Sequence, residues 1–367
     1  MSKILILSNS IEGLFCFRKE VIQAYRDKGC EVHISCPCDG NVHLWNWFYS
    51  TGCKMIETPF KRKGMNPFSD LVLMMKYVKI IKTLNPDIVL SYTIKPNIYG
   101  GIACSICHVP QLANITGLGA AVEYPGILRT LTMFLYRIGL KKAKTVFFQN
   151  QENLQFCVSH KMVKGHMRLI PGSGVNLTYH AFKPYPEESG LIKFIFIARI
   201  RKEKGIEEYL TAAKEIKRTF PNTEFHILGI CEAAYEERLD EMQDEGIIIY
   251  HGQQADVRPF FAQCHCTVHP TFYPEGMSNV LLESCATGRP IITTNRAGCR
   301  EIVEEGINGF IVREQDSADL VSKIKQFITL PYDRKAEMGL CARRKVEKEF
   351  DRNIVVKAYL EESKEYV

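Results

Sequence analysis

The sequence of 367 residues predicts an α/β protein built from two doubly wound domains. The chain is too long for one ordinary hydrophobic core, since a domain holds roughly 150 residues. Apolar residues make up 46% and charged residues 24%, which is typical of globular proteins and excludes disordered, collagen-like and coiled-coil classes. In both halves, short β-branched runs alternate with helix-length amphipathic segments. This alternation indicates parallel sheets covered by helices on both faces.

The first half contains six expected strands separated by helical patterns. The strands are residues 4–7, 31–36, 55–58, 88–91, 111–115 and 145–149, and the helices are 15–28, 69–84, 98–107 and 127–142. Residues 96–122 contain no Asp, Glu, Lys or Arg, but proline, asparagine and glutamine interrupt the stretch. We therefore expect a buried helix, a turn and a buried strand there, and no membrane-spanning helix.

The second half repeats the pattern after a short linker. Its expected strands are residues 194–198, 224–228, 247–250, 266–269, 290–293 and 310–312. Residues 182–190 are rich in proline and charge, as interdomain linkers are. We expect domains at 1–183 and 191–350, with a C-terminal helix at 351–367 that packs back on the first domain. The carboxyl ends of both sheets are expected to border one ligand-binding cleft.

Cysteine usage and the N-terminus indicate the compartment. Residues 1–8 contain an apolar run too short for a signal peptide, so we expect a cytoplasmic protein. The fourteen cysteines are scattered, which favours reduced, buried thiols. Two groups have ligand-like spacing, and we favour packed core over haem or metal in both. These groups are Cys104, Cys107 and His108, and Cys264, His265, Cys266 and His269.

The net charge of +6 is divided unevenly along the chain. Residues 1–178 hold 21 Lys and Arg against 10 Asp and Glu, a net +11, whereas the remainder holds 26 against 31, a net −5. A basic first half favours contact with anionic phospholipid or an anionic substrate, and a solvated basic surface is the alternative. Nucleic acid is disfavoured because no binding module is evident. The cations include Lys61, Arg62, Lys63, Arg129, Arg137, Lys141, Lys142, Lys144, Lys161, Lys164 and Arg168.

One helix in this basic half has a marked apolar stripe. In residues 127–140, apolar side chains recur at three- and four-residue spacing, and we expect them to face the sheet. Membrane contact is then expected to depend on charge. The stripe consists of Ile127, Leu128, Leu131, Phe134, Leu135 and Ile138.

A cation pair follows the first strand of the second half. Neither a Walker A motif nor G-x-G-x-x-G is present, which disfavours ATP hydrolysis and ordinary NAD binding. Arg199 and Lys204 instead lie between the strand 194–198 and a helix. Two cations at a strand's carboxyl end, next to a helix N-terminus, can neutralise a diphosphate. A solvated charged segment is the alternative.

A pair of carboxylates forms the sharpest motif. Glu275 and Glu283 are eight residues apart, slightly over two helical turns, with Gly276 in the turn before the helix. This spacing lets the two carboxylates contact different parts of one extended ligand. A role in capping and surface charge is the alternative.

Together, Glu-x7-Glu, the Arg199/Lys204 pair and residues 171–176 resemble the retaining glycosyltransferases of family 4, which have the GT-B fold. The resemblance implies a nucleotide-sugar donor and no metal. It implies that Arg199 and Lys204 bind the donor diphosphate, Glu283 the ribose and Glu275 the transferred sugar. It also implies further donor contacts from Gly174, Gly276, Met277, Ser278, Asn279 and Val280.

The first half resembles the subgroup that builds capsule, O-antigen and lipid-linked oligosaccharides, on the segments 95–101 and 116–119. It departs from the commonest family pattern, with a serine-rich turn at 8–13 in place of a glycine pair and Thr116 where many members have histidine. The resemblance implies an acceptor site, although Arg18 and Lys95 have a structural role as the alternative. The candidate residues are Ser10, Arg18, Lys95, Thr116 and Gly117.

The sequence thus predicts a retaining hexosyl or N-acetylhexosaminyl transferase. Its expected donor is a UDP-sugar and its expected acceptor is a sugar linked to polyprenyl diphosphate. We expect it on the inner face of the cytoplasmic membrane, as a peripheral protein. The alternatives are the same fold acting on a soluble acceptor, a sugar-nucleotide epimerase and a noncatalytic nucleotide-binding module.

Overall fold

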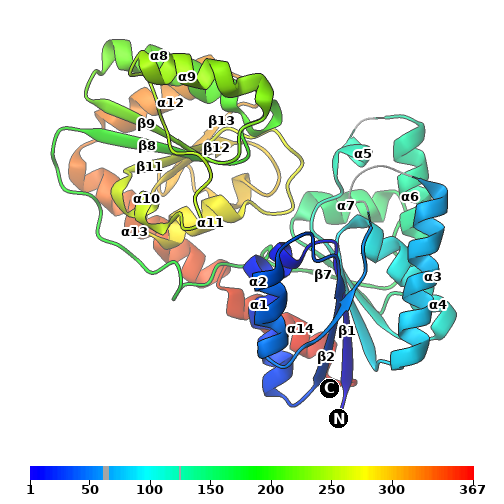
Figure 1. Ribbon diagram of the computed structural model, residues 1–367. Coiled ribbons are helices and arrows are strands. Elements are labelled where there is room, and N and C mark those ends of the chain that lie inside the picture. The colour runs from blue at the N-terminus through cyan, green and yellow to red at the C-terminus, as the bar shows by residue number, and fades with distance from the viewer. Residues whose placement is uncertain (61–65, 124) are drawn as a thin grey trace. The chain divides into compact units, whose positions relative to one another are not determined.

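The computed structural model describes residues 1–60, 66–123 and 125–367. The chain forms two compact units: unit 1 comprises Met1–Gly174 and Arg352–Val367, and unit 2 comprises Val175–Asp351. Each unit is a parallel sheet with helices on both faces (Figure 1). The predicted fold class, two doubly wound α/β domains, is confirmed.

Unit 1 has a seven-stranded sheet in the order β3-β2-β1-β4-β5-β6-β7. Its strands are β1 Lys3–Leu7, β2 Glu31–Cys36, β3 Lys54–Glu57, β4 Ile88–Tyr92, β5 Gln111–Ile115, β6 Thr145–Phe148 and β7 His166–Leu169. Its helices are α1 Ile11–Asp27, α2 Val42–Ser50, α3 Pro67–Leu84, η1 Pro96–Gly100, α4 Gly101–Cys107, α5 Ala120–Glu123, α6 Ile127–Gly139, α7 Gln151–Ser159 and α14 Arg352–Glu362.

Six of these strands were expected and β7 was not. The central strands β4 and β5 are buried at every position, whereas β7 at the sheet edge is half-buried and polar. A short edge strand with His and Arg lacks the apolar run that marks a buried strand. The strand order reverses between β1 and β4, which places a ligand-binding crevice at their carboxyl ends.

Unit 2 has a six-stranded sheet in the order β10-β9-β8-β11-β12-β13. Its strands are β8 Ile192–Ile197, β9 Thr223–Leu228, β10 Ile249–Tyr250, β11 Cys266–His269, β12 Ile291–Thr294 and β13 Gly309–Val312. Its helices are η2 Lys202–Lys204, α8 Ile206–Thr219, η3 Ala233–Tyr235, α9 Glu236–Asp244, α10 Arg258–Gln263, α11 Asn279–Ala286, η4 Arg300–Ile302, α12 Ser317–Thr329 and α13 Tyr332–Glu349. The reversal here lies between β8 and β11, and ligands of such sheets bind at the carboxyl ends of the strands beside this point.

The two units meet in the chain at Gly174–Val175, before the proline-rich segment 182–190 that the sequence indicated as linker. Arg289 explains why the start of that segment belongs to unit 2. Its guanidinium is completely buried and donates to the carbonyl oxygens of Lys183 and Pro184 at 3.1 and 2.8 Å. It also donates to the carbonyls of Phe261, Ala262 and Gly288.

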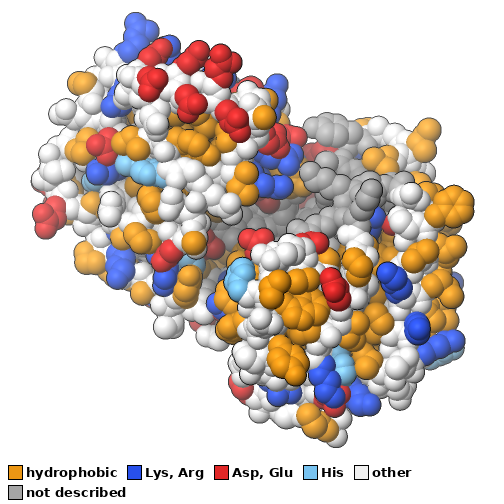
Figure 2. Space-filling view, in the orientation of Figure 1, with side chains coloured by type: hydrophobic (Ala, Val, Ile, Leu, Met, Phe, Trp, Pro, Cys, Tyr) orange, Lys and Arg blue, Asp and Glu red, His pale blue; other side chains and the backbone are white. Residues whose placement is uncertain are grey.

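Helix α6 corrects the expectation that its apolar stripe faces the sheet. Its buried residues are Thr132, Tyr136 and Gly139. A Cβ on Gly139 would lie 2.6 Å from the Cα of Ile98, so the helix approaches η1 too closely for any other residue. This close packing turns the stripe outward, and apolar side chains gather on that flank of unit 1 (Figure 2). The exposed members are Ile127, Leu128, Leu131, Phe134 and Ile138.

None of the helices in the described ranges combines the length and the apolar character needed to cross a bilayer.

We predict that Arg289→Met lowers the free energy of unfolding by about 3–5 kcal/mol, because five carbonyls lose the buried charged donor that binds them. Arg313→Met is the control, since Arg313 is 75% exposed and its surface ion pairs contribute about 1 kcal/mol or less. Urea unfolding followed by circular dichroism measures both variants. Equal midpoints for the two variants would show that the buried guanidinium does not hold the segment in place.

Candidate active site

Two loops are joined at the carboxyl edge of the unit 2 sheet, one after β8 and one after β11. The carbonyl of Glu203 accepts hydrogen bonds from Phe272 N–H at 3.0 Å and from the Thr271 hydroxyl at 3.1 Å. Gly205 has φ +81°, and a Cβ there would lie 2.1 Å from the carbonyl oxygen of Pro270. Glycine is therefore required for the loops to touch.

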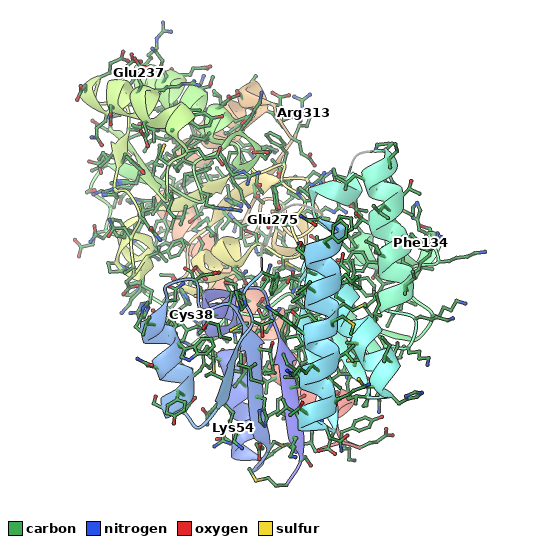
Figure 3. All side chains as sticks on the ribbon, turned by 45° about the vertical axis from the view of Figure 1, so that its right-hand side comes forward. Cys38, Lys54, Phe134, Glu237, Glu275 and Arg313 are labelled. Atoms are coloured by element: carbon green, nitrogen blue, oxygen red, sulfur yellow. The ribbon has the colours of Figure 1, made fainter. Side chains whose placement is uncertain are left out.

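This contact brings together two residues that the sequence places 71 positions apart. The Lys204 ammonium forms an ion pair with the Glu275 carboxylate. The side chains are only 12% and 18% exposed. Figure 3 shows Glu275 in the loop that precedes α11. Arg199 follows β8 at the same edge and is exposed. The predicted site residues Arg199, Lys204 and Glu275 thus share one edge of unit 2.

Tyr273 is a component of this site that sequence reasoning missed. The Lys204 Nζ lies 4.7 Å from the centre of its ring, and the Arg201 guanidinium carbon lies 5.3 Å from it. Arg201 also binds both oxygens of Glu203 and lowers the pKa of that carboxyl. The aromatic ring restrains two cations at the carboxyl edge of the unit 2 sheet. Arg201 was visible in the basic segment after β8, but only the folded chain places Tyr273 against it.

The turn from Gly276 to α11 is shaped by a second close backbone approach. A Cβ on Gly298 would lie 2.7 Å from the carbonyl oxygen of Gly276. The Gly298 carbonyl accepts from Ser278 N–H at 2.8 Å, so this N–H is already used within the protein. Met277 and Ser278 are buried, while Asn279 and Val280 open the first turn of α11. The helix N-terminus and its partial positive charge point into the same edge.

Glu283 lies on the second turn of α11, and its Oε1 is 3.9 Å from His180 Nε2. A cavity of about 450 Å³ adjoins this pair, lined by His180, by Thr287 one turn beyond Glu283 and by the start of α10. Inside it, the Arg258 guanidinium carbon lies 3.9 Å from the centre of the Tyr179 ring. Arg258 is also bound to both oxygens of Asp256, which lowers the pKa of that carboxyl. The cavity combines an aromatic face with charged groups.

Gly174 packs inside unit 1. A Cβ there would lie 2.5 Å from the Cα of Arg352, and the Gly174 carbonyl accepts from the Arg352 guanidinium at 3.1 Å. The local structure thus accounts for glycine at this position.

Below the unit 2 site, the strand β11 is buried and uncharged. Burial and the nearby Lys204 lower the pKa of His269 to about 3, and burial lowers that of His265 to about 4. Burial raises the pKa of the Cys264 and Cys266 thiols. His265 Nδ1 accepts from the backbone N–H of Lys193 at 3.1 Å. These side chains are therefore part of the packed core around β11, as the sequence indicated.

In unit 1, Ser10 follows β1, and Arg18 lies on α1 with its guanidinium over Tyr92, the last residue of β4. Ser10 caps α1, since its hydroxyl accepts from Gly13 N–H at 3.0 Å. Arg18 is 3% exposed, and its guanidinium carbon lies 5.0 Å from the centre of the Tyr92 ring. The guanidinium also donates a hydrogen bond to the carbonyl of Phe17 at 3.0 Å. A buried guanidinium held by an aromatic ring suits an anionic ligand at this edge.

Lys95 has a protein partner. Its ammonium donates to Asp70 at 2.8 Å, and the Tyr99 hydroxyl donates to the other Asp70 oxygen at 2.9 Å. The network joins η1 to α3. Thr93, two residues earlier, has φ +74°, a strained conformation for a β-branched residue. Thr116 and Gly117 follow β5 at the same edge of the sheet.

The basic surface of unit 1 is smaller than its composition indicated. Lys144 is paired with Glu365, and Arg168 with Glu361 and Glu362. Arg137 donates to the carbonyl of His160 at 2.8 Å. Lys61, Arg62 and Lys63 lie outside the described residues. The C-terminal segment therefore neutralises part of the predicted basic set.

Comparison with known proteins addresses function. The family model "Glycosyl transferases group 1" matches residues 180–345, and "Glycosyl transferase 4-like" matches residues 3–150. The chain belongs to these glycosyltransferases. A similar protein is the N,N'-diacetylbacillosaminyl-diphospho-undecaprenol alpha-1,3-N-acetylgalactosaminyltransferase of Campylobacter jejuni, 26% identical over 96% of both chains. The capsular polysaccharide glycosyltransferase CapM of Staphylococcus aureus is 27% identical over 81% of both.

Solved structures show the same fold. A glycosyltransferase from Rickettsia africae superposes with a TM-score of 0.80 at 20% identity, covering 100% of this chain and 98% of the other. HepE from Anabaena, solved in complex with UDP, has a TM-score of 0.78 at 16% identity and full coverage of both chains. The predicted GT-B fold and glycosyltransferase family are confirmed.

We predict that Tyr273→Ala lowers kcat/KM of this glycosyltransferase about tenfold, because loss of the ring leaves Lys204 and Arg201 without their shared aromatic partner. Tyr273→Phe keeps the ring and is expected to retain nearly full activity. Nucleotide release from the sugar donor measures both variants. An unchanged rate in Tyr273→Ala would contradict the positioning role.

Proposed function

We propose that this glycosyltransferase moves a hexose or N-acetylhexosamine from a UDP-sugar to a sugar carried on polyprenyl diphosphate, with retention of configuration. The observation that carries the acceptor class is the similarity, over 96% of both chains, to a transferase whose name specifies a diphospho-undecaprenol sugar. The capsule-forming relative supports a role in surface polysaccharide synthesis.

The donor is proposed to bind at the edge of unit 2. Lys204 and Arg199 are the diphosphate ligands in this proposal, with the N-terminus of α11 adding its dipole. Glu283 is assigned the ribose hydroxyls and the adjoining cavity is assigned the base, because an aromatic and charged lining suits a nucleoside. UDP is the proposed nucleotide, with support from the UDP complex of a protein that shares the fold.

The chemistry requires positive charge beside the leaving group. Cleavage of the bond between sugar and diphosphate creates an oxocarbenium-like sugar and leaves one additional negative charge on the terminal phosphate of the nucleotide. Fixed cations in a partly dry crevice stabilise that charge as it develops. Lys204, held between Glu275 and the Tyr273 ring, supplies such a cation. We propose that Lys204 and Arg199 perform this task without a metal ion, and that Glu275 faces the transferred sugar.

The acceptor diphosphate is proposed to bind at the edge of unit 1. Arg18 is the strongest candidate there, because it is a buried cation that contacts the Tyr92 ring and forms no ion pair with any residue that the structure describes. Ser10 follows β1, and Thr116 and Gly117 follow β5, which flank β4 in the sheet; these residues are proposed to complete the site. Lys95 contributes through its pair with Asp70, which fixes η1. A lipid-linked acceptor also implies contact with an anionic membrane surface, where we place the protein on the cytoplasmic side.

We predict that UDP release from a UDP-hexose or UDP-N-acetylhexosamine requires a polyprenyl-diphosphate-linked sugar and persists in EDTA. A soluble sugar alone should give background release. NMR of the product is expected to show the anomeric configuration of the donor. Release with the soluble sugar alone would favour the soluble-acceptor alternative. A tenfold loss in EDTA that magnesium restores would show that a metal performs the task assigned to the cations.

The two carboxylates are expected to have separable roles. Glu283→Ala should raise the donor KM about tenfold or more, since a charged hydrogen bond to the ribose is worth roughly 1.5–3 kcal/mol. Glu275→Gln should lower kcat about a hundredfold and change KM less, because it acts at the reacting sugar. Glu241→Ala, on the exposed face of α9, is the control. Wild-type kinetics in both site variants would contradict the assignment.

A further inference from the structure

Unit 1 exposes an unusual amount of apolar side chain on two helices. On α6, Ile127 is 90% exposed and Phe134 is 54% exposed, and the stripe recurs at four, seven and eleven residues along the helix. Figure 3 shows Phe134 on the outer side of α6. On α3, Phe68, Leu71, Val72 and Met75 form a second exposed stripe with spacings of three, four and seven residues. Contiguous exposed apolar surface usually marks an interaction site.

The two stripes belong to one flank. Helices α3 and α6 both pack against η1 and α4. The packing is fixed by glycines, since a Cβ on Gly101 would lie 2.0 Å from the carbonyl oxygen of Gly139. The α6 stripe therefore cannot turn inward without breaking this contact.

The exposed charges on α3 and α6 are cationic, whereas one exposed acid, Glu123, lies just before α6. Helix α6 contains no carboxylate and is followed by the exposed Lys141 and Lys142. Helix α3 carries Lys76, Lys79 and Lys82 on its exposed surface, and its one acid, Asp70, is buried in the pair with Lys95. Apolar residues bordered by lysine are the pattern of helices that lie in the headgroup region of anionic membranes.

On both helices, the most exposed apolar side chain lies at the N-terminal end, toward the proposed acceptor site. In a parallel sheet, the helix that follows a strand begins at the strand's carboxyl edge. Phe68, at 83% exposed, lies in the first turn of α3, and Ile127 is the first residue of α6. These side chains thus lie toward the edge of unit 1 that carries Ser10, Arg18 and Thr116.

We propose that the α3–α6 flank docks on an anionic bilayer by inserting its apolar stripes into the interface, with the first turns of both helices at the membrane. This inference rests on the proposed lipid-linked acceptor, whose diphosphate would then meet the carboxyl edge of unit 1 at the headgroup level. Insertion and charge act together: the stripes supply apolar burial, and the lysines supply attraction to anionic headgroups.

The test is co-sedimentation of the full chain with vesicles of phosphatidylcholine alone or of phosphatidylcholine mixed with anionic phosphatidylglycerol, because anionic headgroups attract basic segments. The variant is Leu131→Ser/Phe134→Ser. Its matched control is Leu340→Ser/Ile354→Ser, which removes two side chains of similar exposure, 42% and 40%, from α13 and α14. We expect the α6 variant to bind anionic vesicles at least tenfold more weakly and the control to bind as the wild type does.

Vesicle binding measured at low and at high ionic strength distinguishes apolar insertion from electrostatic attraction. Lys141→Gln/Lys142→Gln should weaken binding at low ionic strength and match the wild type at high ionic strength, where residual wild-type binding reflects the stripes. Wild-type binding that disappears at high salt, together with unchanged binding of the α6 variant, would overturn the proposal in favour of charge alone. A wild-type dimer that the α6 variant converts to monomer in size-exclusion chromatography would overturn it in favour of a second copy as the occupant.

Activity distinguishes failure of the docking proposal from failure of the proposed function. With a short-chain polyprenyl-diphosphate acceptor in solution, the α6 variant should turn over at the wild-type rate, because its substitutions lie outside the site. With the same acceptor headgroup embedded in anionic vesicles, it should lose at least tenfold. If the wild type transfers sugar to none of the polyprenyl-linked acceptors, the proposed function is wrong. Vesicle binding then still decides whether the α3–α6 flank docks on the membrane.

Discussion

The ion pair between Lys204 and Glu275 is the interaction on which the arrangement of unit 2 depends. It joins the loop after β8 to the loop after β11, at the point where the strand order reverses. Both side chains are largely shielded from water, so the pair is less screened than one on the surface. The same loops are joined by backbone hydrogen bonds to Glu203 and by the close approach of Gly205 to Pro270. The surrounding packing therefore holds the Lys204 ammonium in place at this edge of the sheet.

The cations of this arrangement are held in position by the protein itself, and such preorganised charge stabilises a transition state most effectively. A cation that must be ordered during the reaction loses part of its stabilising effect, whereas one already held acts at once on the developing charge. Tyr273 contributes by presenting its ring to two cations. The N-terminus of α11 adds a dipole from the other side, although one of its entering N–H groups, that of Ser278, is bound to Gly298. The site thus combines side-chain cations and a helix dipole at the carboxyl edge of the unit 2 sheet.

The sheet of unit 1 reverses its strand order in the same way as that of unit 2, but different side chains lie at its carboxyl edge. Its carboxyl edge carries a capping serine, a buried arginine over a tyrosine and a strained threonine, in place of a dense cation pair. Small residues also decide its outer surface. Because Gly101 and Gly139 let α6 approach the chain at Ile98, a narrow face of threonine, tyrosine and glycine is buried and the wide apolar face is left outside. A helix that would otherwise cover the sheet with its apolar side becomes available to a partner.

The sequence by itself determined the fold class, twelve of the strands and the family, because these depend on local periodicity and on motifs of contiguous residues such as Glu275 to Glu283. It did not reveal β7, whose polar edge position gives no apolar run. Tertiary structure alone decided three matters. It set Tyr273 against Arg201 and Lys204, it paired Lys95 with Asp70, and it chose which face of α6 is buried. Periodicity shows that a helix has an apolar side, but the direction of that side depends on which neighbour allows the closest approach.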